Sequence, residues 1–147
     1  KVWDSVEEFD DEFWENRYES IRNFEKHLAN NGTTIIKIFL NISKKEQKKR
    51  FLDRIDEQEK NWKFSMGDLP ERALWDEYMK AYEKAINETS KDHAPWFVIP
   101  GDDKWFARVA AIQIIIDALE GMNLKFPKLS AEDQKALESA RKQLESE

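Results

Sequence analysis

Residues 33–55 read TTIIKIFLNISKKEQKKRFLDRI, and this stretch decides the fold class of the chain. Its first part, residues 33–40, is rich in β-branched and apolar side chains without strict alternation, which predicts a strand covered on both faces, as in a parallel sheet. Ser43 then stands where a helix N-cap belongs, and Glu46 follows three residues later, which is the capping-box pattern. We therefore expect a buried strand followed by a helix over residues 44–56.

The segments on both sides of this stretch alternate between helix and strand. Upstream, apolar residues at three- and four-residue spacing predict a helix from about Asp10, which Gly32 ends by taking the left-handed conformation. Downstream, the pattern predicts a functional loop over 57–69, a helix opened by Pro70 and ending near Ser90, and a short buried strand over 96–100. A helix is expected over 103–119, and its apolar run 109–116 must be buried on most sides. The last predicted element is a charged helix over 130–147. This order is typical of an α/β protein.

Two predicted strands are too few to cover so much apolar helix surface, because parallel sheets carry helices on both faces and usually have more strands. The chain also begins with Lys1 instead of Met. We therefore expect residues 1–126 to be the carboxyl-terminal portion of a larger α/β unit, followed by a charged helical appendage in 127–147. A mainly helical domain with a two-stranded ribbon is the alternative.

The composition excludes several classes of protein. The 147 residues contain no Cys and two His, which excludes disulfide scaffolds, zinc–thiolate sites, cysteine nucleophiles and multi-histidine metal sites. The four glycines lie at least 20 residues apart, so neither a P-loop nor a dinucleotide-binding fingerprint is present. A net charge of −6 disfavours nucleic-acid binding, and no apolar run approaches the roughly 18 residues of a membrane span. We expect a cytoplasmic protein that binds neither nucleic acid nor membranes.

Residues 44–63 form a cationic segment, with eight Lys and Arg against five Asp and Glu. Arg50 and Arg54 share a helix face by their four-residue spacing, and Lys60 and Lys63 follow in the loop. An Arg guanidinium can donate two hydrogen bonds to a pair of phosphate oxygens, and Lys supplies a mobile point charge. This composition therefore suits a lid that binds phosphate. A solvated amphipathic helix with internal ion pairs is the alternative.

Three further cations are candidates for binding an anionic substrate. Lys104 and Arg108 share one face of the helix start after the second strand, and ligands of open α/β sheets lie at the carboxyl ends of strands. An ordinary Asp-capped helix start is the alternative. Lys37 lies inside an apolar strand, where its ammonium must be paired or must reach water by snorkelling to a sheet edge. The acidic residues of 4–15 are typical of a solvated helix start, and we predict no metal ligand in this chain.

Several of these motifs together resemble the polyphosphate kinase 2 family. The resemblance runs in order from about Trp14 to Leu124. It is carried by FEKHL at 24–28, NGT at 31–33, KIFLNISKKEQKKRF at 37–51, KNWKFS at 60–65, ERALWDEY at 71–78, TS at 89–90, APW at 94–96 and DKWF at 103–106. The sequence departs from the family pattern at Gln58, where Pro is common, and at Gly101, where Ala is usual.

This resemblance implies a P-loop kinase-like three-layer α/β/α fold, similar to thymidylate kinases, with a mobile helical lid at about 44–69. It implies Mg²⁺-dependent phosphoryl transfer between inorganic polyphosphate and a nucleoside mono- or diphosphate. In that picture Arg50 and Arg54 act on the lid helix, with Lys60 and Lys63 in the lid loop. Lys37, Lys104 and Arg108 line the polyphosphate or nucleotide side. A homo-oligomer is expected.

The family's P-loop, and its second motif with the Mg²⁺- and acceptor-binding residues, lie upstream of the part that this chain resembles. We therefore predict that these 147 residues alone have no kinase activity. Two alternatives are a non-catalytic anion-binding or scaffold module that lacks the kinase core, and a kinase of similar fold that uses ATP as donor. The cationic segment disfavours the ATP-dependent kinase, because a polyanionic chain needs more cations than one nucleoside triphosphate.

Overall fold

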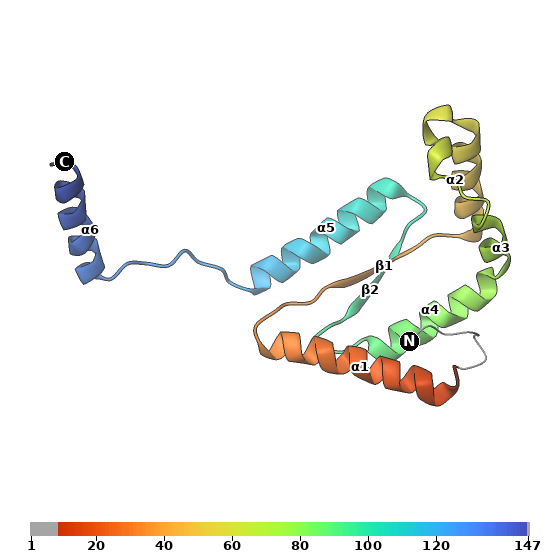
Figure 1. Ribbon diagram of the computed structural model, residues 1–147, viewed down its shortest axis with the longest axis horizontal. Coiled ribbons are helices and arrows are strands. Elements are labelled where there is room, and N and C mark those ends of the chain that lie inside the picture. Colours follow the sequence, from red (N-terminus) through yellow and green to blue (C-terminus); the bar gives the residue numbers. More distant parts are fainter. Residues whose placement is uncertain (1–8, 147) are drawn as a thin grey trace. The chain divides into compact units, whose positions relative to one another are not determined.

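The structure, a computed structural model, describes residues 9–146. It divides into two units, Lys1–Ile116 and Asp117–Glu147, and each is described by itself. The first unit contains a small parallel sheet with helices, and the second contains a terminal helix (Figure 1). The chain is therefore a helix-rich α/β protein, as predicted.

The sheet consists of β1 (Lys37–Asn41) and β2 (Trp96–Pro100), which pair in parallel with Lys37 opposite Trp96 and Asn41 opposite Pro100. Because both strands run in the same direction, the chain must cross over between them. The crossover is made by α2 (Lys44–Asp56), the 3₁₀ helix η2 (Gln58–Lys63), α3 (Asp68–Ala73) and α4 (Trp75–Thr89). Helix α1 (Asp11–Asn30) precedes the sheet and α5 (Lys104–Gly121) follows it.

Alternate residues of β1 point to opposite faces of the sheet. Lys37 contacts α1 and α4 through Glu25 and the Thr89 carbonyl, and the Phe39 ring lies 5.0 Å from that of Tyr82 on α4. Figure 1 shows α1 and α4 on one side of the two strands and α5 on the other. The first unit thus has helices on either side of its small parallel sheet (Figure 1).

The predicted ends of α1 are confirmed by local contacts. Asp10 is the N-cap, since its Oδ1 accepts a hydrogen bond of 2.8 Å from the Phe13 N–H. Gly32 has a φ of +85°, the left-handed conformation expected after the helix. Strand β1 is shorter than predicted and begins at Lys37 instead of residue 33.

Two predictions about the crossover are wrong. Residues 57–69, expected to form a loop, contain η2 and the start of α3. The helix expected to open at Pro70 begins two residues earlier, at Asp68, and it is divided at Leu74, where α4 follows α3. A proline is tolerated in this first helical turn because the N–H groups there have no intrahelical acceptor.

The prediction that α5 is buried on most sides is also wrong. Val109, Ile112 and Ile115 are 45%, 56% and 43% exposed, and Ala107 is the buried residue of this helix. A helix that is apolar on all sides needs cover on more than one side, and the two described strands supply cover on one. The exposure of α5 therefore follows from the size of the sheet.

The second unit contains α6 (Ala131–Leu144), which Ser130 caps by accepting a hydrogen bond of 3.1 Å from the Asp133 N–H. The predicted charged helix is therefore present, between Ala131 and Leu144. Within residues 9–146, none of the helices is long and apolar enough to cross a membrane.

Candidate functional site

The candidate site lies at the carboxyl ends of β1 and β2, which we call the carboxyl edge of the sheet. The Gly101 N–H donates a 2.8 Å hydrogen bond to the Asn41 carbonyl, so the two strand ends stay together. Helix α2 begins directly after β1 and α5 directly after β2. Ligands of open α/β sheets lie at this edge, so α2 and α5 both begin where a ligand of such a sheet would lie.

Gly101 permits a close approach of the two strand ends. A Cβ atom at this position would lie 2.8 Å from Ile42 Cγ2, closer than real contacts allow. Alanine, which is usual here in the family that the sequence resembles, would therefore require Ile42 to shift. The close contact with Ile42 therefore explains why this chain has Gly at position 101, where the family usually has Ala.

The lid helix α2 is capped by residues from both strand ends. The Glu46 N–H donates a 3.0 Å hydrogen bond to Ser43 Oγ, which confirms half of the predicted capping box. The other half is wrong: the Ser43 N–H donates to Asp102 Oδ1 at 2.7 Å, and the Glu46 carboxylate accepts from Arg50 Nε. Hydrogen bonds from the Ser43 backbone and side chain lower the pKa of Asp102, and the Arg50 charge adds to the effect.

We predict that Asp102→Asn lowers the stability of the chain at neutral pH but not in acid. Because the folded pKa is lowered, the stabilising effect is present above the ordinary carboxyl value of 3.8 and is lost as the pH falls through the lowered value. Urea unfolding midpoints of both proteins, measured from about pH 6 to about pH 2, should therefore converge at low pH. Asp92→Asn, a change at an exposed loop aspartate, is the control. A difference between wild type and Asp102→Asn that stays constant with pH would contradict the assignment.

Arg50 connects the lid helix to the turn after β2. Its Nε donates to Glu46 Oε1 at 2.8 Å, and its Nη2 donates to the Gly101 carbonyl at 2.7 Å. The pair with Glu46 is the internal ion pair that the solvated-helix alternative expects. The guanidinium lies at the carboxyl edge, where its hydrogen bond to the Gly101 carbonyl links α2 to the turn after β2.

The remaining lid cations lie at the far end of α2 and in η2. Within the described residues Arg54 has no ion-pair partner, and its Cζ atom lies 5.6 Å from the Phe51 ring centroid. Lys60 pairs with Glu57 at 2.5 Å, and the Lys63 ammonium lies 5.1 Å from the ring of Trp62. Trp62 is 80% exposed.

Asn61 holds η2 against the end of α2, a role that the sequence analysis missed. Its Nδ2 donates to the carbonyls of Arg54 and Ile55 at 2.8 and 2.7 Å, which satisfies two open carbonyls of the helix end. The signal was an Asn shortly after a helix end, which is too common to be diagnostic.

Lys104 and Arg108 lie in the first turns of α5, at the carboxyl edge, and both are exposed. Asp103 Oδ1 accepts hydrogen bonds from the N–H groups of Trp105 and Phe106 at 2.8 and 3.0 Å. The Asp-capped helix start is therefore present, and it occupies two of the N–H groups that an anion would use. Within residues 9–146 neither Lys104 nor Arg108 forms an ion pair.

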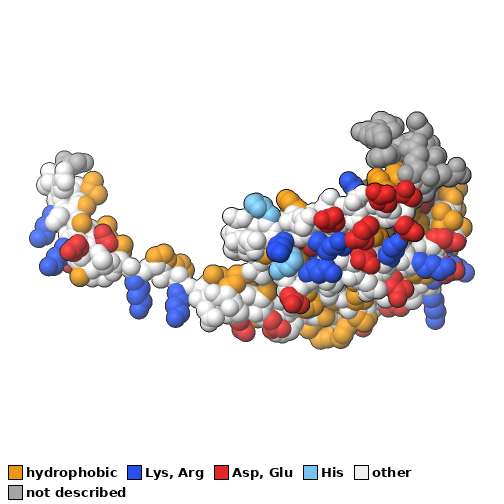
Figure 2. All heavy atoms as spheres, turned by 90° about the horizontal axis from the view of Figure 1, so that it is seen from below, with side chains coloured by type: hydrophobic (Ala, Val, Ile, Leu, Met, Phe, Trp, Pro, Cys, Tyr) orange, Lys and Arg blue, Asp and Glu red, His pale blue; other side chains and the backbone are white. Residues whose placement is uncertain are grey.

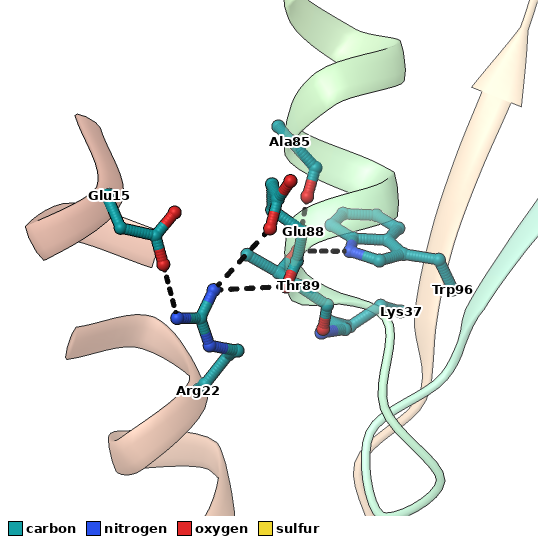
Figure 3. A network of polar contacts seen from close by, with 7 residues as sticks. All are labelled: Glu15, Arg22, Lys37, Ala85, Glu88, Thr89 and Trp96. Carbon is teal, nitrogen blue, oxygen red and sulfur yellow. Dashed lines mark hydrogen bonds and ion pairs between the residues drawn. The ribbon is translucent and has the colours of Figure 1, made fainter. Parts of the chain in front are cut away.

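Lys37 is at the opposite end of β1 from the other predicted site residues. Its ammonium lies 2.7 Å from Glu25 Oε2 and 2.7 Å from the Thr89 carbonyl, and its side chain is 11% exposed. Figure 3 shows it beside Thr89 and Trp96, with Arg22 bonded to Glu15 and the end of α4 nearby. The ammonium is therefore paired inside the protein, which supports a structural role.

A hollow of about 370 Å³ lies beside β1, between the strand, the lid helix and α4. At its rim Arg72 donates a 2.7 Å hydrogen bond to Gln47 Oε1, which links α3 to the lid helix. Tyr78 bonds to the Glu71 carboxylate, which raises the pKa of the tyrosine hydroxyl. These two contacts were not predicted from the sequence, because Arg72 and Gln47 lie on different helices and Glu71 and Tyr78 are seven residues apart.

The described residues contain no cluster of metal-ligating side chains. No group of three or more His, Asp or Glu side chains in 9–146 is arranged to hold a metal ion. At the carboxyl edge the Asp102 and Asp103 carboxylates already accept backbone N–H groups. Figure 2, which views the first unit from the α1 side, shows acidic and basic side chains interspersed over that face.

Comparison with known proteins identifies the family of this chain. The sequence model of the polyphosphate kinase 2 (PPK2) family matches residues 2–127. An ADP-polyphosphate phosphotransferase of Rhodopseudomonas palustris is 51% identical over 138 residues, which are 94% of this chain and 48% of that protein. A crystal structure of polyphosphate kinase 2 from Arthrobacter aurescens TC1 superposes with a TM-score of 0.81 at 48% identity, over 90% of this chain and 47% of that one.

The chain thus spans about half the length of these two relatives. A third relative is different in this respect. An uncharacterized protein of Leptolyngbya boryana is 49% identical over 134 residues, which are 91% of this chain and 98% of that protein.

Proposed function

Because the chain belongs to the polyphosphate kinase 2 family, we propose that it forms the carboxyl-terminal half of a polyphosphate-dependent nucleotide kinase. The whole enzyme would transfer a phosphoryl group between inorganic polyphosphate and a nucleoside mono- or diphosphate, on a P-loop kinase-like three-layer fold. The name of the Rhodopseudomonas palustris relative supports this reaction, and the parallel sheet between helix layers supports this fold.

The observation that carries the proposal is the position of the cationic segment. Its helix starts at the carboxyl edge, where ligands of such sheets lie, and continues into η2 with its exposed Lys63. Arg54 has no carboxylate partner among the described residues, so its charge is available to an anion. Polyphosphate is a chain of negative charges and requires several such groups in a row.

We assign the predicted residues to parts of this reaction as follows. Arg54 and Arg50 contact the transferred phosphoryl group, since phosphoryl transfer depends mainly on positioning and on neutralising charge at the moving group. Lys60 and Lys63 contact polyphosphate when the lid closes. Lys104 and Arg108 contact the substrate phosphates from α5. We leave Lys37 out of this set, because Glu25 and the Thr89 carbonyl already hold its ammonium.

The upstream half would provide the phosphate-binding loop and the ligands of Mg²⁺. The metal, when bound there, would bridge and neutralise phosphate oxygens. We further propose a cytoplasmic homo-oligomer in which residues 127–147 are an appendage to the kinase domain. These proposals rest on family membership and on the match ending at residue 127.

The test is an activity comparison between the whole enzyme and the 147-residue chain. We expect the whole enzyme to phosphorylate AMP, ADP or GDP with polyphosphate faster than with ATP, and the chain alone to form no product. We expect no product because the chain contains no P-loop to bind the phosphates. Circular dichroism should show that the inactive chain is nevertheless folded. Product formation by the chain alone would refute the assignment of its role, and a preference for ATP would favour the ATP-dependent kinase.

One observation favours the non-catalytic anion-binding module as a second candidate. The Leptolyngbya boryana relative is matched over 98% of its own length, so a protein of about this extent is known. If this module is the function, the chain alone should bind polyphosphate tightly, and adding an upstream half should produce no activity. Titration calorimetry with polyphosphate distinguishes the two functions.

A further inference from the structure

Glu46 on the lid helix does not make the contact that its place in the sequence predicts. In a capping box the side chain of this glutamate accepts the N–H of the capping residue, which is Ser43 here. Instead, Asp102 Oδ1 from the turn after β2 accepts that N–H at 2.7 Å. The Glu46 carboxylate lies 2.8 Å from Arg50 Nε. Because Asp102 caps the helix from another element, Glu46 is available to hold the arginine one turn further along.

The guanidinium of Arg50 is held by two different elements. Its Nε donates to Glu46 Oε1 within α2, and its Nη2 donates to the Gly101 carbonyl after β2 at 2.7 Å. The N–H groups of a guanidinium have a rigid planar arrangement, so two such hydrogen bonds fix both its position and its plane. The orientation of this side chain is therefore set before any ligand binds.

Part of this guanidinium has no acceptor in the described part of the chain. The contacts of Arg50 with Glu46 and Gly101 use Nε and Nη2, and Nη1 donates to no acceptor among residues 9–146. The remaining N–H groups of Nη1 and Nη2 are suited to a pair of phosphate oxygens, since a guanidinium binds phosphate through two parallel hydrogen bonds. Glu46 thus occupies one side of Arg50 and leaves donors for an anion.

A second Arg–Glu pair in the chain shows how the pair at Glu46 differs from a surface contact. Arg141 and Glu145 on α6 have the same spacing along the helix and the same distance of 2.8 Å between Nε and Oε1. Their side chains are 80% and 60% exposed, whereas those of Arg50 and Glu46 are 26% and 17% exposed. Exposed pairs contribute little, because ordering two long side chains costs entropy and water screens their attraction. The burial of Glu46 makes its hold on Arg50 firmer.

We propose that Glu46 is a positioning residue, which holds the Arg50 guanidinium at the carboxyl edge so that its remaining N–H groups bind the phosphoryl group being transferred. The inference rests on the function proposed above, and it adds a residue that touches no substrate itself. Donors that are already oriented contribute most where charge develops in the transition state, because they need not reorganise at that moment. Loss of Glu46 should therefore lower kcat and leave the KM for polyphosphate nearly unchanged.

The first experiment measures steady-state kinetics of the whole enzyme with polyphosphate and nucleotide. Glu46→Ala should lower kcat by about 10- to 100-fold, and Glu46→Gln, which keeps an oxygen that accepts from Arg50 Nε, should restore most of the rate. In an Arg50→Ala background, Glu46→Ala should lower kcat no further, because there is no guanidinium left to position. Glu145→Ala is the matched control and should keep the wild-type rate. A wild-type rate for Glu46→Ala, or an equal fall in both backgrounds, would overturn the proposal.

The second experiment tests the geometry without catalysis, by NMR of the 147-residue chain. The Arg50 Nε–H should exchange slowly with water, since it is hydrogen-bonded and partly buried, and Glu46→Ala should speed this exchange severalfold. The Arg141 Nε–H, in the exposed pair, is the internal reference and should exchange fast in both proteins. Unchanged exchange at Arg50 would overturn the proposal. A wild-type whole enzyme that forms no product would instead reject the proposed function, and the exchange rates would still decide whether Glu46 holds Arg50.

Discussion

Arg54→Ala lowers the turnover number of the whole enzyme by about 100-fold, because a guanidinium that neutralises a moving phosphoryl group contributes mainly in the transition state. Arg54 has no carboxylate partner among residues 9–146, so its charge does not stabilise the fold through an ion pair there. Its contact with the Phe51 ring is a cation–π contact of 5.6 Å, and contacts of this kind contribute about 0.5–1 kcal/mol at exposed sites. The change should therefore cost activity and little stability.

The measurements are steady-state kinetics with polyphosphate and nucleotide, together with urea unfolding of the same variant. Arg54→Lys keeps the positive charge but lacks the planar guanidinium that donates two hydrogen bonds at once. We expect its turnover number to fall by about tenfold, less than for Arg54→Ala. Arg141→Ala is the matched control, since Arg141 lies on α6 and its side chain is 80% exposed. A wild-type rate for Arg54→Ala, or a large fall in its unfolding free energy, would count against the role of Arg54.

Lys37→Met lowers the free energy of unfolding by about 3 kcal/mol, because it leaves the buried Glu25 carboxylate without its partner. Both side chains are 11% exposed, and the two charged atoms lie 2.7 Å apart. Removing both charges, in Glu25→Leu with Lys37→Met, should restore most of the loss, since buried ion pairs are often no better than apolar replacements. Urea unfolding of the four proteins measures the coupling between the two residues.

The matched control is Lys84→Met, because Lys84 also pairs with α1, through Asp11 at 3.3 Å. That pair is exposed on both sides, at 52% and 98%, and should contribute less than about 0.5 kcal/mol. The same variants also decide between a structural and a binding role for Lys37. Unchanged stability with a raised KM for polyphosphate would return Lys37 to the phosphate-binding set.

The helices and strands were predictable because their signals are local. Ser43 and Ser130 cap helices that begin at the next residue, and β2 occupies the predicted residues 96–100. The division at Leu74 was missed because an apolar face continues through both α3 and α4. Periodicity detects which residues share a helix face, but it does not detect a change in the direction of the helix axis.

The candidate site was predictable in composition and only partly in geometry. The cationic segment and the start of α5 do follow the carboxyl ends of the two strands. The hydrogen bond from Arg50 to Gly101 and that from Ser43 to Asp102 join residues more than 50 positions apart. Such pairs depend on the path of the chain, which no short-range pattern contains.

The amino-acid sequence by itself determined the order of elements, the helix caps and the position of the cationic segment, because capping, periodicity and charge are properties of neighbouring residues. The tertiary structure decided that one of the predicted site residues, Lys37, is held by Glu25 and the Thr89 carbonyl. It also decided that several apolar residues of α5 are exposed in the part of the chain that the structure describes. Burial depends on how much sheet is present to cover a helix, and that is a property of the assembled fold.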